Sequence, residues 1–331
     1  MHHKIKVSIV IPVYNVAPYV AECIQSVMNQ TWEGPLECIL VDDCGTDDSI
    51  AVVENKLKDY KGTVDFKILH HERNRGLSAA RNSGMDAATG EYVYFLDSDD
   101  EITPDCIERL AAPLEKEAYD LVVGDYRIVG SNMPKAPLLL KDGISLHGDD
   151  VLKSYRKQEW YMLSVNKLYQ TAFLNRHHLR FYEGIIHEDE LWSFQIACLA
   201  KSLHAVGSET YIYKIREGSI TIKRNHERRC HCINVVLKEM CSFTEEHHLG
   251  QNKDVHNLIQ NFQMITLNSI HSEAPELFKK FYAEQRQTMN TGWTACLMLN
   301  GLDIRKQLRD VHLLLPLSWA IPYLKLLFHF L

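Results

Sequence analysis

The feature that most constrains this chain is a repeated alternation, in its first half, between short apolar runs and segments with helical spacing. Strand-like runs are expected at 5–11, 36–42, 64–69, 91–96 and 120–124. Between them, apolar residues recur every three or four positions, as at Val20, Ile24 and Val27. A strand–helix repeat predicts an α/β fold: parallel strands joined by right-handed crossovers, with helices on both faces of the sheet. Ligands of such sheets bind beyond the carboxyl ends of the strands.

The residues that follow each predicted strand have unusual chemistry. They are Pro12, Tyr14 and Asn15 after the first strand, Asp43 after the second, Arg81 after the third, and Asp97, Ser98 and Asp99 after the fourth. The carboxyl ends of parallel strands meet at one edge of a sheet, so aromatic, acidic and basic groups are expected together at that edge.

The segment 97–101 holds four acidic residues in five positions. Like charges this close repel one another unless a cation lies among them. Mg²⁺ and Mn²⁺ favour oxygen ligands and often take one or two carboxylates together with substrate phosphates. The segment is therefore a predicted metal site. The alternative is a solvated loop before a helix that is capped at Thr103 and has Pro104 in its first turn.

Three other positions at this edge have both a ligand-binding and a structural interpretation. Asp43 is placed to accept hydrogen bonds from a base or a ribose, or to form a turn. Tyr14 is suited to stack on a base, or to pack in its loop. Arg81 lies in the expected first turn of a helix, where a cation is unfavourable. An anion would explain it: the acidic segment, a diphosphate or both, the alternative being a structural salt bridge.

Beyond residue 146 the alternation fades, and short β-like pieces at 168–169, 203–206 and 211–213 surround a predicted helix near 188–200. That helix begins with Glu188, Asp189 and Glu190, which the helix dipole favours as a cap. The loop near Arg216 has a Gly-Ser turn and two cations. It is suited to cover a diphosphate or to form an ordinary surface loop.

Together these stretches closely resemble the family 2 glycosyltransferases with the GT-A fold, of the bacterial cell-surface polysaccharide type. The matching segments are 7–15, 41–47, 76–82 and 94–100, with further matches at 166–169, 187–189 and 216–221. The resemblance is dense over 4–125, and the region from about 225 onward matches no family. The Gln-x-x-Arg-Trp motif of processive synthases is absent from the sequence, which favours the addition of one sugar at a time.

The resemblance implies a role for each of these residues. Pro12, Tyr14 and Asn15 would form the nucleotide pocket, with Asp43 on the base. Asp97 and Ser98 would lie near the ribose and phosphates, Asp99 would bind Mn²⁺ or Mg²⁺, and Arg81 and Arg216 would support the diphosphate. Asp189 would be the base of an inverting transfer, with Glu188 as the competing candidate. The donor would be a nucleotide-diphosphate sugar, a UDP-sugar above all, and the acceptor a glycan or a lipid-linked glycan.

The change of pattern predicts a catalytic region over 1–222, with the nucleotide-sugar side at 1–125 and the acceptor side and base at 126–222. A helical region is expected over 223–331. Its end, 313–331, is apolar but interrupted by two prolines, and is too short for a bilayer span. We expect it to dock on the membrane surface through Trp319 and Tyr323, with Arg305, Lys306 and Arg309 upstream on the anionic lipid head groups. The alternative is a last amphipathic helix packed on the catalytic domain.

Charge and cysteine content indicate which partners and which cellular compartment to expect. A net charge of −7 argues against nucleic-acid binding, which needs a basic face. The nine cysteines are odd in number and irregularly spaced, which favours a reducing cytoplasm, here at the inner face of the membrane.

Two other functions remain as alternatives to sugar transfer. A nucleotidyltransferase would need a glycine-rich phosphate loop where Pro12 stands, and an inactive paralogue that only binds nucleotide sugars would not need Asp97, Asp99 and Asp189.

Overall fold

The computed structural model describes residues 4–130, 135–136, 138–215, 225–289 and 299–329. The chain divides into two compact units. The first comprises 1–184 and 188–219, and the second comprises 185–187 and 220–331.

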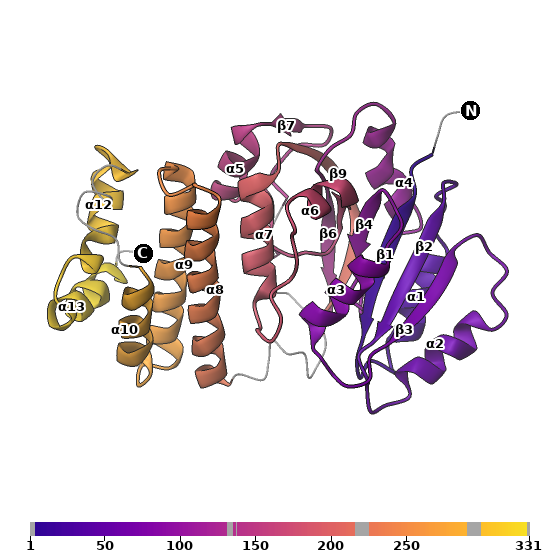
Figure 1. Ribbon diagram of the computed structural model, residues 1–331, viewed down its shortest axis with the longest axis horizontal. Helices are drawn as coiled ribbons and strands as arrows, with labels where there is room; N and C mark the ends of the chain where they lie inside the picture. Colours follow the sequence, from indigo (N-terminus) through magenta and orange to yellow (C-terminus); the bar gives the residue numbers. More distant parts are fainter. Residues whose placement is uncertain (1–3, 131–134, 137, 216–224, 290–298, 330–331) are drawn as a thin grey trace. The chain divides into compact units, whose positions relative to one another are not determined.

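The first unit is built on one nine-stranded sheet with the order β3-β2-β1-β4-β8-β6-β9-β5, in which β7 also pairs with β9 (Figure 1). The strands are β1 (Val7–Val13), β2 (Leu36–Asp42), β3 (Asp65–His70), β4 (Tyr92–Phe95), β5 (Glu101–Ile102), β6 (Leu121–Val129), β7 (Ser145–His147), β8 (Lys167–Gln170) and β9 (Ser202–Lys214). Strands β1 to β4 are mutually parallel, as the alternation predicts. The α/β prediction is therefore confirmed, and β8 is inserted antiparallel between β4 and β6.

Helices connect these strands and cover both faces of the sheet. They are α1 (Val20–Met28), α2 (Ser49–Leu57), α3 (Leu77–Ala87), α4 (Cys106–Ala111), η1 (Ala112–Glu115), α5 (Asp149–Arg156), α6 (Thr171–Arg176) and α7 (Glu188–Leu199). Helices α1 and α2 pack on each other, and α3 packs on β1 and β2. All seven residues of β1 are buried, because the strand lies in the sheet interior and both its faces are covered.

Three local expectations change in the structure. Helix α4 begins at Cys106 with Asp105 at its N-cap, so Thr103 does not cap it; the Thr103 hydroxyl instead donates to the Asp105 carboxylate at 2.7 Å. Arg81 is the fifth residue of α3 and so lies in the second turn. The two β-like pieces at 203–206 and 211–213 are one strand, β9, which pairs with β6 across an irregular register near Asp125.

The amino-end edge of the sheet contains a buried ion-pair network around Glu37. Its carboxylate accepts from the Ser8 hydroxyl at 2.5 Å, the Thr89 backbone N–H at 2.7 Å and the Lys67 ammonium at 2.8 Å. Lys6 adds a second ammonium at 3.1 Å. Burial alone would raise the pKa of Glu37, but these partners outweigh it and lower the pKa to about 2.

The second unit is helical. Its elements are α8 (His226–Glu246), α9 (Lys253–Glu273), α10 (Phe278–Thr288), α12 (Ile304–Asp310), η2 (Val311–Leu313) and α13 (Leu317–Leu327). Asn225 and Asn252 cap α8 and α9 by accepting hydrogen bonds from the first turn. One hydrophobic cluster joins α8, α9, α10 and α13, and includes Leu267, Tyr282 and Leu324, each fully buried.

Candidate active site

The loops after β1 and β2 meet at the carboxyl edge of the sheet. Val13, the last residue of β1, lies opposite Asp42, the last residue of β2. Asn15 adopts a positive φ of 52°, and its side-chain oxygen accepts from the backbone N–H of Thr46 at 2.8 Å, which ties the two loops together. Tyr14 between them is 46% exposed. Pro12 is buried inside β1, so it lies within the sheet, beneath the two loops.

Asp43 is almost fully buried, and both of its oxygens are engaged. Oδ1 accepts from the Arg75 backbone N–H at 2.8 Å and contacts His71 Nδ1 at 2.7 Å. Oδ2 accepts from the backbone N–H of Gly76 at 2.7 Å. Gly76 has a φ of 89°, which favours glycine, and it precedes α3. Asp43 therefore fixes the loop that leads into α3. Three acceptor positions are filled, and a carboxylate offers about four.

His71 is a member of this site that the sequence interpretation did not single out. Its Nδ1 faces Asp43, and its Nε2 lies 2.8 Å from the hydroxyl of Ser83 on α3. The neutral ring can donate from Nδ1 to Asp43 and accept from Ser83 at Nε2, so one tautomer satisfies both contacts. The only sequence signal would have been a histidine directly after β3, at the same edge as Asp43.

Arg81 is the hub of the site. Its side chain is 1% exposed, and its guanidinium donates to three carboxylates. Nη2 donates to Asp97 Oδ1 at 2.8 Å, while Nη1 reaches Glu188 Oε1 at 3.0 Å and Asp189 Oδ1 at 3.3 Å. The anions beside Arg81 are thus the acidic loop after β4 and the first turn of α7, whose residues lie more than 100 positions along the chain.

Aromatic rings also pack against the Arg81 guanidinium. Arg81 lies over the ring of Phe181 at 5.1 Å, and Phe181 stacks on Trp192 of α7 with ring centroids 4.1 Å apart. Phe95 of β4 contacts both rings edge-on. This cluster joins the sheet to α7, so the position of the acidic first turn of α7 is set by packing as well as by charge.

The buried carboxylates of α7 and the charge on Arg81 affect one another. Burial and the neighbouring Asp189 raise the pKa of Glu188 to about 7, although Arg81 opposes the rise. Burial lowers the pKa of Arg81, and the attraction of its three carboxylates outweighs this and raises it overall. The guanidinium is therefore permanently charged, while burial favours the protonated form of Glu188. Asp189 is the more exposed of the two acids, with 24% of its side chain accessible against 11%.

The acidic loop after β4 is fixed by its last member. Asp100 is 2% exposed, and its carboxylate accepts from the Tyr211 hydroxyl and the Lys214 backbone N–H, both at 2.7 Å. Burial, and repulsion by Asp97 and Asp99, raise the pKa of Asp100 to about 8. The loop therefore presents Asp97 and Asp99 half-exposed and Ser98 buried, with an excess of negative charge behind them.

One cation near this loop, Lys214, has other partners. The Lys214 ammonium is 2.7 Å from Glu22 Oε2 and also contacts Glu101, so it neutralises protein carboxylates in this structure. Arg216, the other predicted phosphate contact, lies outside the described residues. In the described part of the chain, no group of three or more His, Cys, Asp or Glu side chains is arranged to hold a metal ion by itself. A cation at Asp99 would therefore need oxygens from a ligand.

The segment 166–169 supports the site from within the sheet. Asn166, at a φ of 57°, accepts from the Tyr94 and Thr210 hydroxyls and donates to the Asp125 carbonyl, which links four strands at one point. Lys167 is fully buried. Its ammonium donates to the Leu163 carbonyl and lies 3.9 Å from a tyrosine ring. Burial holds its pKa well below the usual range, although the charge of Asp189 opposes this.

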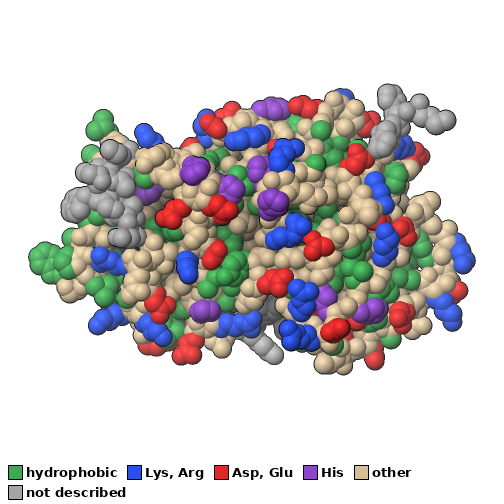
Figure 2. Space-filling model, viewed as in Figure 1, with side chains coloured by type: hydrophobic (Ala, Val, Ile, Leu, Met, Phe, Trp, Pro, Cys, Tyr) green, Lys and Arg blue, Asp and Glu red, His purple; other side chains and the backbone are tan. Residues whose placement is uncertain are grey.

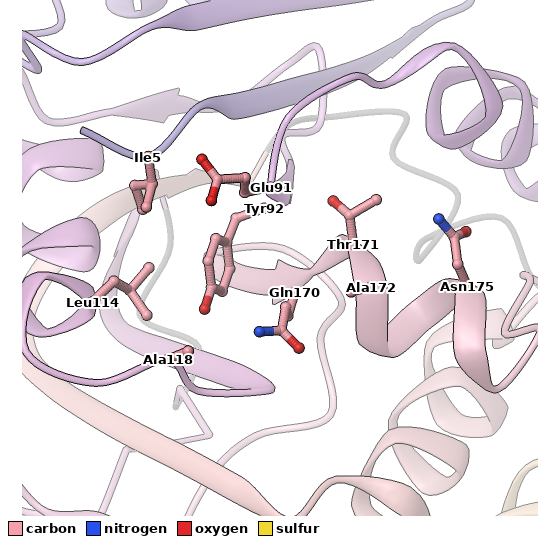
Figure 3. A pocket seen from close by; sticks show the side chains of 9 residues that line it. All are labelled: Ile5, Glu91, Tyr92, Leu114, Ala118, Gln170, Thr171, Ala172 and Asn175. Carbon is pink, nitrogen blue, oxygen red and sulfur yellow. The ribbon is translucent and has the colours of Figure 1, made fainter. Parts of the chain in front are cut away.

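A cavity of about 530 Å³ lies at the opposite edge of the sheet, where β1 and β4 begin. Figure 3 shows Tyr92 between Leu114 and Gln170 in this cavity, with Glu91 and Thr171 beside it. None of the predicted site residues lines it. The structure thus gathers Asp97, Arg81 and Asp189 at the carboxyl edge, away from this cavity.

Comparison with known proteins gives one family and one fold. The family model described as Glycosyl transferase family 2 matches residues 8–179. The putative glycosyltransferase EpsH of Bacillus subtilis is 33% identical over 231 residues, which cover 65% of this chain and 62% of EpsH. TarS of Staphylococcus aureus, a poly(ribitol-phosphate) beta-N-acetylglucosaminyltransferase, is 28% identical over 221 residues, 64% of this chain and 36% of TarS. The chain spans 62%, 41% and 66% of the length of three such curated relatives.

Two solved structures share the architecture. Residues 1–349 of TarS in complex with UDP-GlcNAc align with a TM-score of 0.69 at 20% identity, covering 93% of this chain and 90% of that one. The mannosyltransferase PcManGT of Pyrobaculum calidifontis, in complex with GDP-Man and Mn²⁺, aligns with a TM-score of 0.51 at 15% identity, covering 96% and 84%. These likenesses show the fold, a GT-A sheet followed by a helical C-terminal region.

Proposed function

The chain belongs to glycosyl transferase family 2, and from this premise we propose that it transfers one sugar at a time from a UDP-sugar to a glycan or lipid-linked acceptor in cell-surface polysaccharide synthesis. The observation that carries the proposal is the Arg81 hub. It holds an acidic loop suited to a metal-bound diphosphate beside a pair of acids suited to take a proton, Glu188 and Asp189. Sugar transfer needs the donor diphosphate and the acceptor hydroxyl side by side, and the acidic loop and the pair of acids would bind these two groups next to each other.

The donor nucleotide is assigned to the edge formed by the β1 and β2 loops. Tyr14 is exposed there and offers a ring for stacking on a base. Asp43 keeps one acceptor position on Oδ2, which suits a single N–H donor such as that of a uracil ring. This favours a uridine nucleotide, as does the fold likeness to TarS, which was solved with UDP-GlcNAc. Pro12 and Asn15 set the shape of the pocket, and Ser98 lies beneath the ribose and phosphates.

A divalent cation, Mn²⁺ or Mg²⁺, fits the loop after β4. Hard cations take carboxylate and phosphate oxygens, and Asp99 stands half-exposed in a loop where burial and the charges of Asp97 and Asp99 raise the pKa of Asp100 to about 8. Such an ion would balance the charge of a leaving diphosphate. Within the protein, Arg81 fixes Asp97 beside Asp99, and Arg216 is proposed to approach the diphosphate from the loop after β9.

We assign the base to Asp189. The acceptor hydroxyl gives its proton to Asp189 while its oxygen bonds to C1 of the donor sugar. The bond from C1 to the diphosphate oxygen breaks, and the nucleotide diphosphate leaves with that electron pair. One displacement of this kind inverts the anomeric centre. Asp189 is favoured over Glu188 by its greater exposure and its longer contact with Arg81, whereas Glu188 is favoured by a pKa near neutrality.

The proposal is tested with the full chain and a panel of UDP- and GDP-sugars, by following nucleotide release with Mn²⁺ and with a chelator. We expect release from a UDP-sugar that needs the metal. Asp99→Asn should abolish it and remove only the metal-dependent part of UDP binding in calorimetry. Asp59→Asn, which removes the same charge from an exposed position after α2, should change neither. Metal-dependent UDP binding that is equal in Asp99→Asn and wild type would exclude the metal assignment.

Replacing each acid of α7 with its amide distinguishes the roles of Asp189 and Glu188. Asp189→Asn should leave UDP affinity unchanged and lower kcat by about 10²–10⁴-fold, the range for loss of a general base. Glu188→Gln should keep more activity than Asp189→Asn. The opposite ranking would move the base to Glu188. Formation of pyrophosphate from a nucleoside triphosphate and a sugar phosphate would instead identify a nucleotidyltransferase.

A further inference from the structure

The second unit exposes an unusual concentration of large apolar side chains. Among the described residues thirteen such side chains are exposed, and five of them lie between 302 and 326. They are Leu302 (98% exposed), Ile304 (68%), Leu308 (50%), Trp319 (69%) and Leu326 (59%). Figure 2 shows hydrophobic side chains standing out in the part of the second unit that carries α12 and α13. Exposed apolar groups so concentrated mark an interaction surface.

These side chains form one surface that is built from two helices. Ile304 and Leu308 are four residues apart on α12, and Trp319, Tyr323 and Leu326 follow one another at helical spacing on α13. The Tyr323 hydroxyl donates to the Leu308 carbonyl at 2.6 Å, so the two rows adjoin. We call these residues, with Leu302, the terminal apolar face.

The opposite side of α13 anchors this face to the protein. Ala320 and Leu324 are fully buried in the core cluster of the second unit. Arg286 on α10 donates to the Leu313 and Leu315 carbonyls just before α13 begins, at 3.0 and 2.6 Å. One side of α13 is therefore packed on helices of its own unit, while its other side stays exposed. In the described chain no helix has the length and apolarity to cross a bilayer.

The charges around the face identify its occupant. Arg305, Lys306 and Lys325 carry the basic charge beside it, and Lys306 is paired with Asp303 at 3.1 Å. Arg309, a predicted lipid contact, instead binds the buried carboxylate of Asp310. The region is thus locally basic on a chain of net charge −7. Tryptophan and tyrosine beside exposed leucines, flanked by cations, match the interface of a bilayer with anionic head groups.

We propose that the terminal apolar face seats the protein on the surface of an anionic phospholipid bilayer, with Trp319, Leu326, Ile304 and Leu308 at the level of the head groups and Arg305 and Lys325 on the lipid phosphates. This mode of binding inserts side chains of an already folded helix pair and needs no membrane span. The proposal does not depend on the transferase activity, since it concerns only the second unit.

The test is co-sedimentation of the full chain with vesicles of phosphatidylcholine alone or with one quarter phosphatidylglycerol. We expect binding to the anionic vesicles that weakens with salt. Trp319→Ser should reduce the partition coefficient by about tenfold or more. The control, Ile265→Ser, changes an equally exposed residue (61%) on α9 and should bind normally. Arg305→Glu with Lys325→Glu should also lose about tenfold, and Lys279→Glu with Lys280→Glu, the same charge change on α10, should lose less.

Three results would overturn the proposal. They are the absence of wild-type binding to anionic vesicles at low salt, equal loss in Trp319→Ser and Ile265→Ser, and self-association that Trp319→Ser abolishes without any vesicle binding. The last result would make the face a contact between two copies. Quenching of tryptophan fluorescence by brominated lipid gives a second readout, since it should be lost in Trp319→Ser. The variants change only exposed side chains, so thermal melting should confirm that they fold.

Discussion

The two edges of the central sheet both bury carboxylates, yet they treat them in opposite ways. At the amino edge, Glu37 has two lysines and two hydroxyls around it, and its pKa falls to about 2. At the carboxyl edge, Asp100 and Glu188 have raised pKa values of about 8 and 7. In each case burial favours the neutral acid, so the difference lies in the countercharge that the protein supplies.

At the amino edge the protein itself supplies the countercharge of the buried carboxylate, so this network needs no ligand. Among the described residues of the carboxyl edge, the buried cation Arg81 is shared by three carboxylates, with Asp99 and Asp100 beside them. An acidic excess of this kind costs stability in the free protein and is relieved by a cation from outside. Raised pKa values that cluster at one edge are typical of binding sites, and the ligands of such sheets bind at this same edge.

The largest expected effect tests Arg81. Arg81→Met should remove the countercharge from Asp97, Glu188 and Asp189 and cost about 3–5 kcal/mol in the free energy of unfolding. Arg109→Met breaks an exposed pair with Asp105 and should cost at most about 1 kcal/mol. Urea denaturation of the two variants gives both values. Similar losses would show that the carboxyl edge does not depend on its buried cation.

The second effect is stabilisation by ligand. Mn²⁺ and UDP together, at a hundred times their dissociation constant, should raise the free energy of unfolding by about 2.7 kcal/mol, and a chelator should reverse this. Binding should also release protons near pH 7, because a cation at the loop lowers the raised pKa of Asp100. Calorimetry in buffers of different ionisation enthalpy measures that release. Proton uptake would contradict the assignment of the acidic excess to a cation site.

The third effect concerns the amino edge and acid pH. Glu37 has a folded pKa of about 2 against 4.5 for an unperturbed glutamate, so its contribution is present above pH 4.5 and lost as the pH falls towards 2. Glu37→Gln should lower the free energy of unfolding at pH 7 by about 1–3 kcal/mol and flatten its slope below pH 4.5. Denaturation curves from pH 2 to 7 test this, with exposed Glu54→Gln as the control.

The smallest effect has the opposite sign. Asp100 ionises near pH 8 in the folded protein and near 3.8 in an unperturbed aspartate, so its contribution to stability declines as the pH rises between these values. Asp100→Asn stays neutral, but its NH2 group would face a donor that the carboxylate accepts from, which offsets most of the gain from removing the charge. The variant should therefore be more stable than wild type at pH 8 by only about 1 kcal/mol, and less stable than wild type at pH 4. An equal destabilisation at both pH values would show that the hydrogen bonds to Tyr211 and Lys214 outweigh the charge.

The alternation of the sequence was enough to predict β1 to β4 and the helices between them, because each strand and helix shows its own local period. It also placed the candidate site residues at the strand ends. Helix α7 was expected near 188–200 and spans Glu188–Leu199. The antiparallel insertion of β8 was beyond local reasoning, since its four residues pair with strands more than 40 positions away.

The partners of the site residues were the least predictable part. Arg81 and Glu188 are separated by 107 positions, and His71 by 28 from Asp43, so only the folded sheet brings them together. Lys167 is buried against an expectation that lysines face solvent. In the second unit, Gln260, Gln263 and Gln285 are fully buried without a hydrogen-bond partner among the described residues, and helical spacing gave no sign of this.

The Arg81 hub has a consequence for exchanging parts between relatives. A chimaera that joins the donor half of this chain to the acceptor half of another, with a junction near Val129, would separate Arg81 from Glu188 and Asp189. The incoming half must therefore bring an acidic pair at the start of the corresponding helix and a ring in the place of Phe181. The part of the chain after Val129 can be exchanged only together with counterions for Arg81, a residue that lies before the junction.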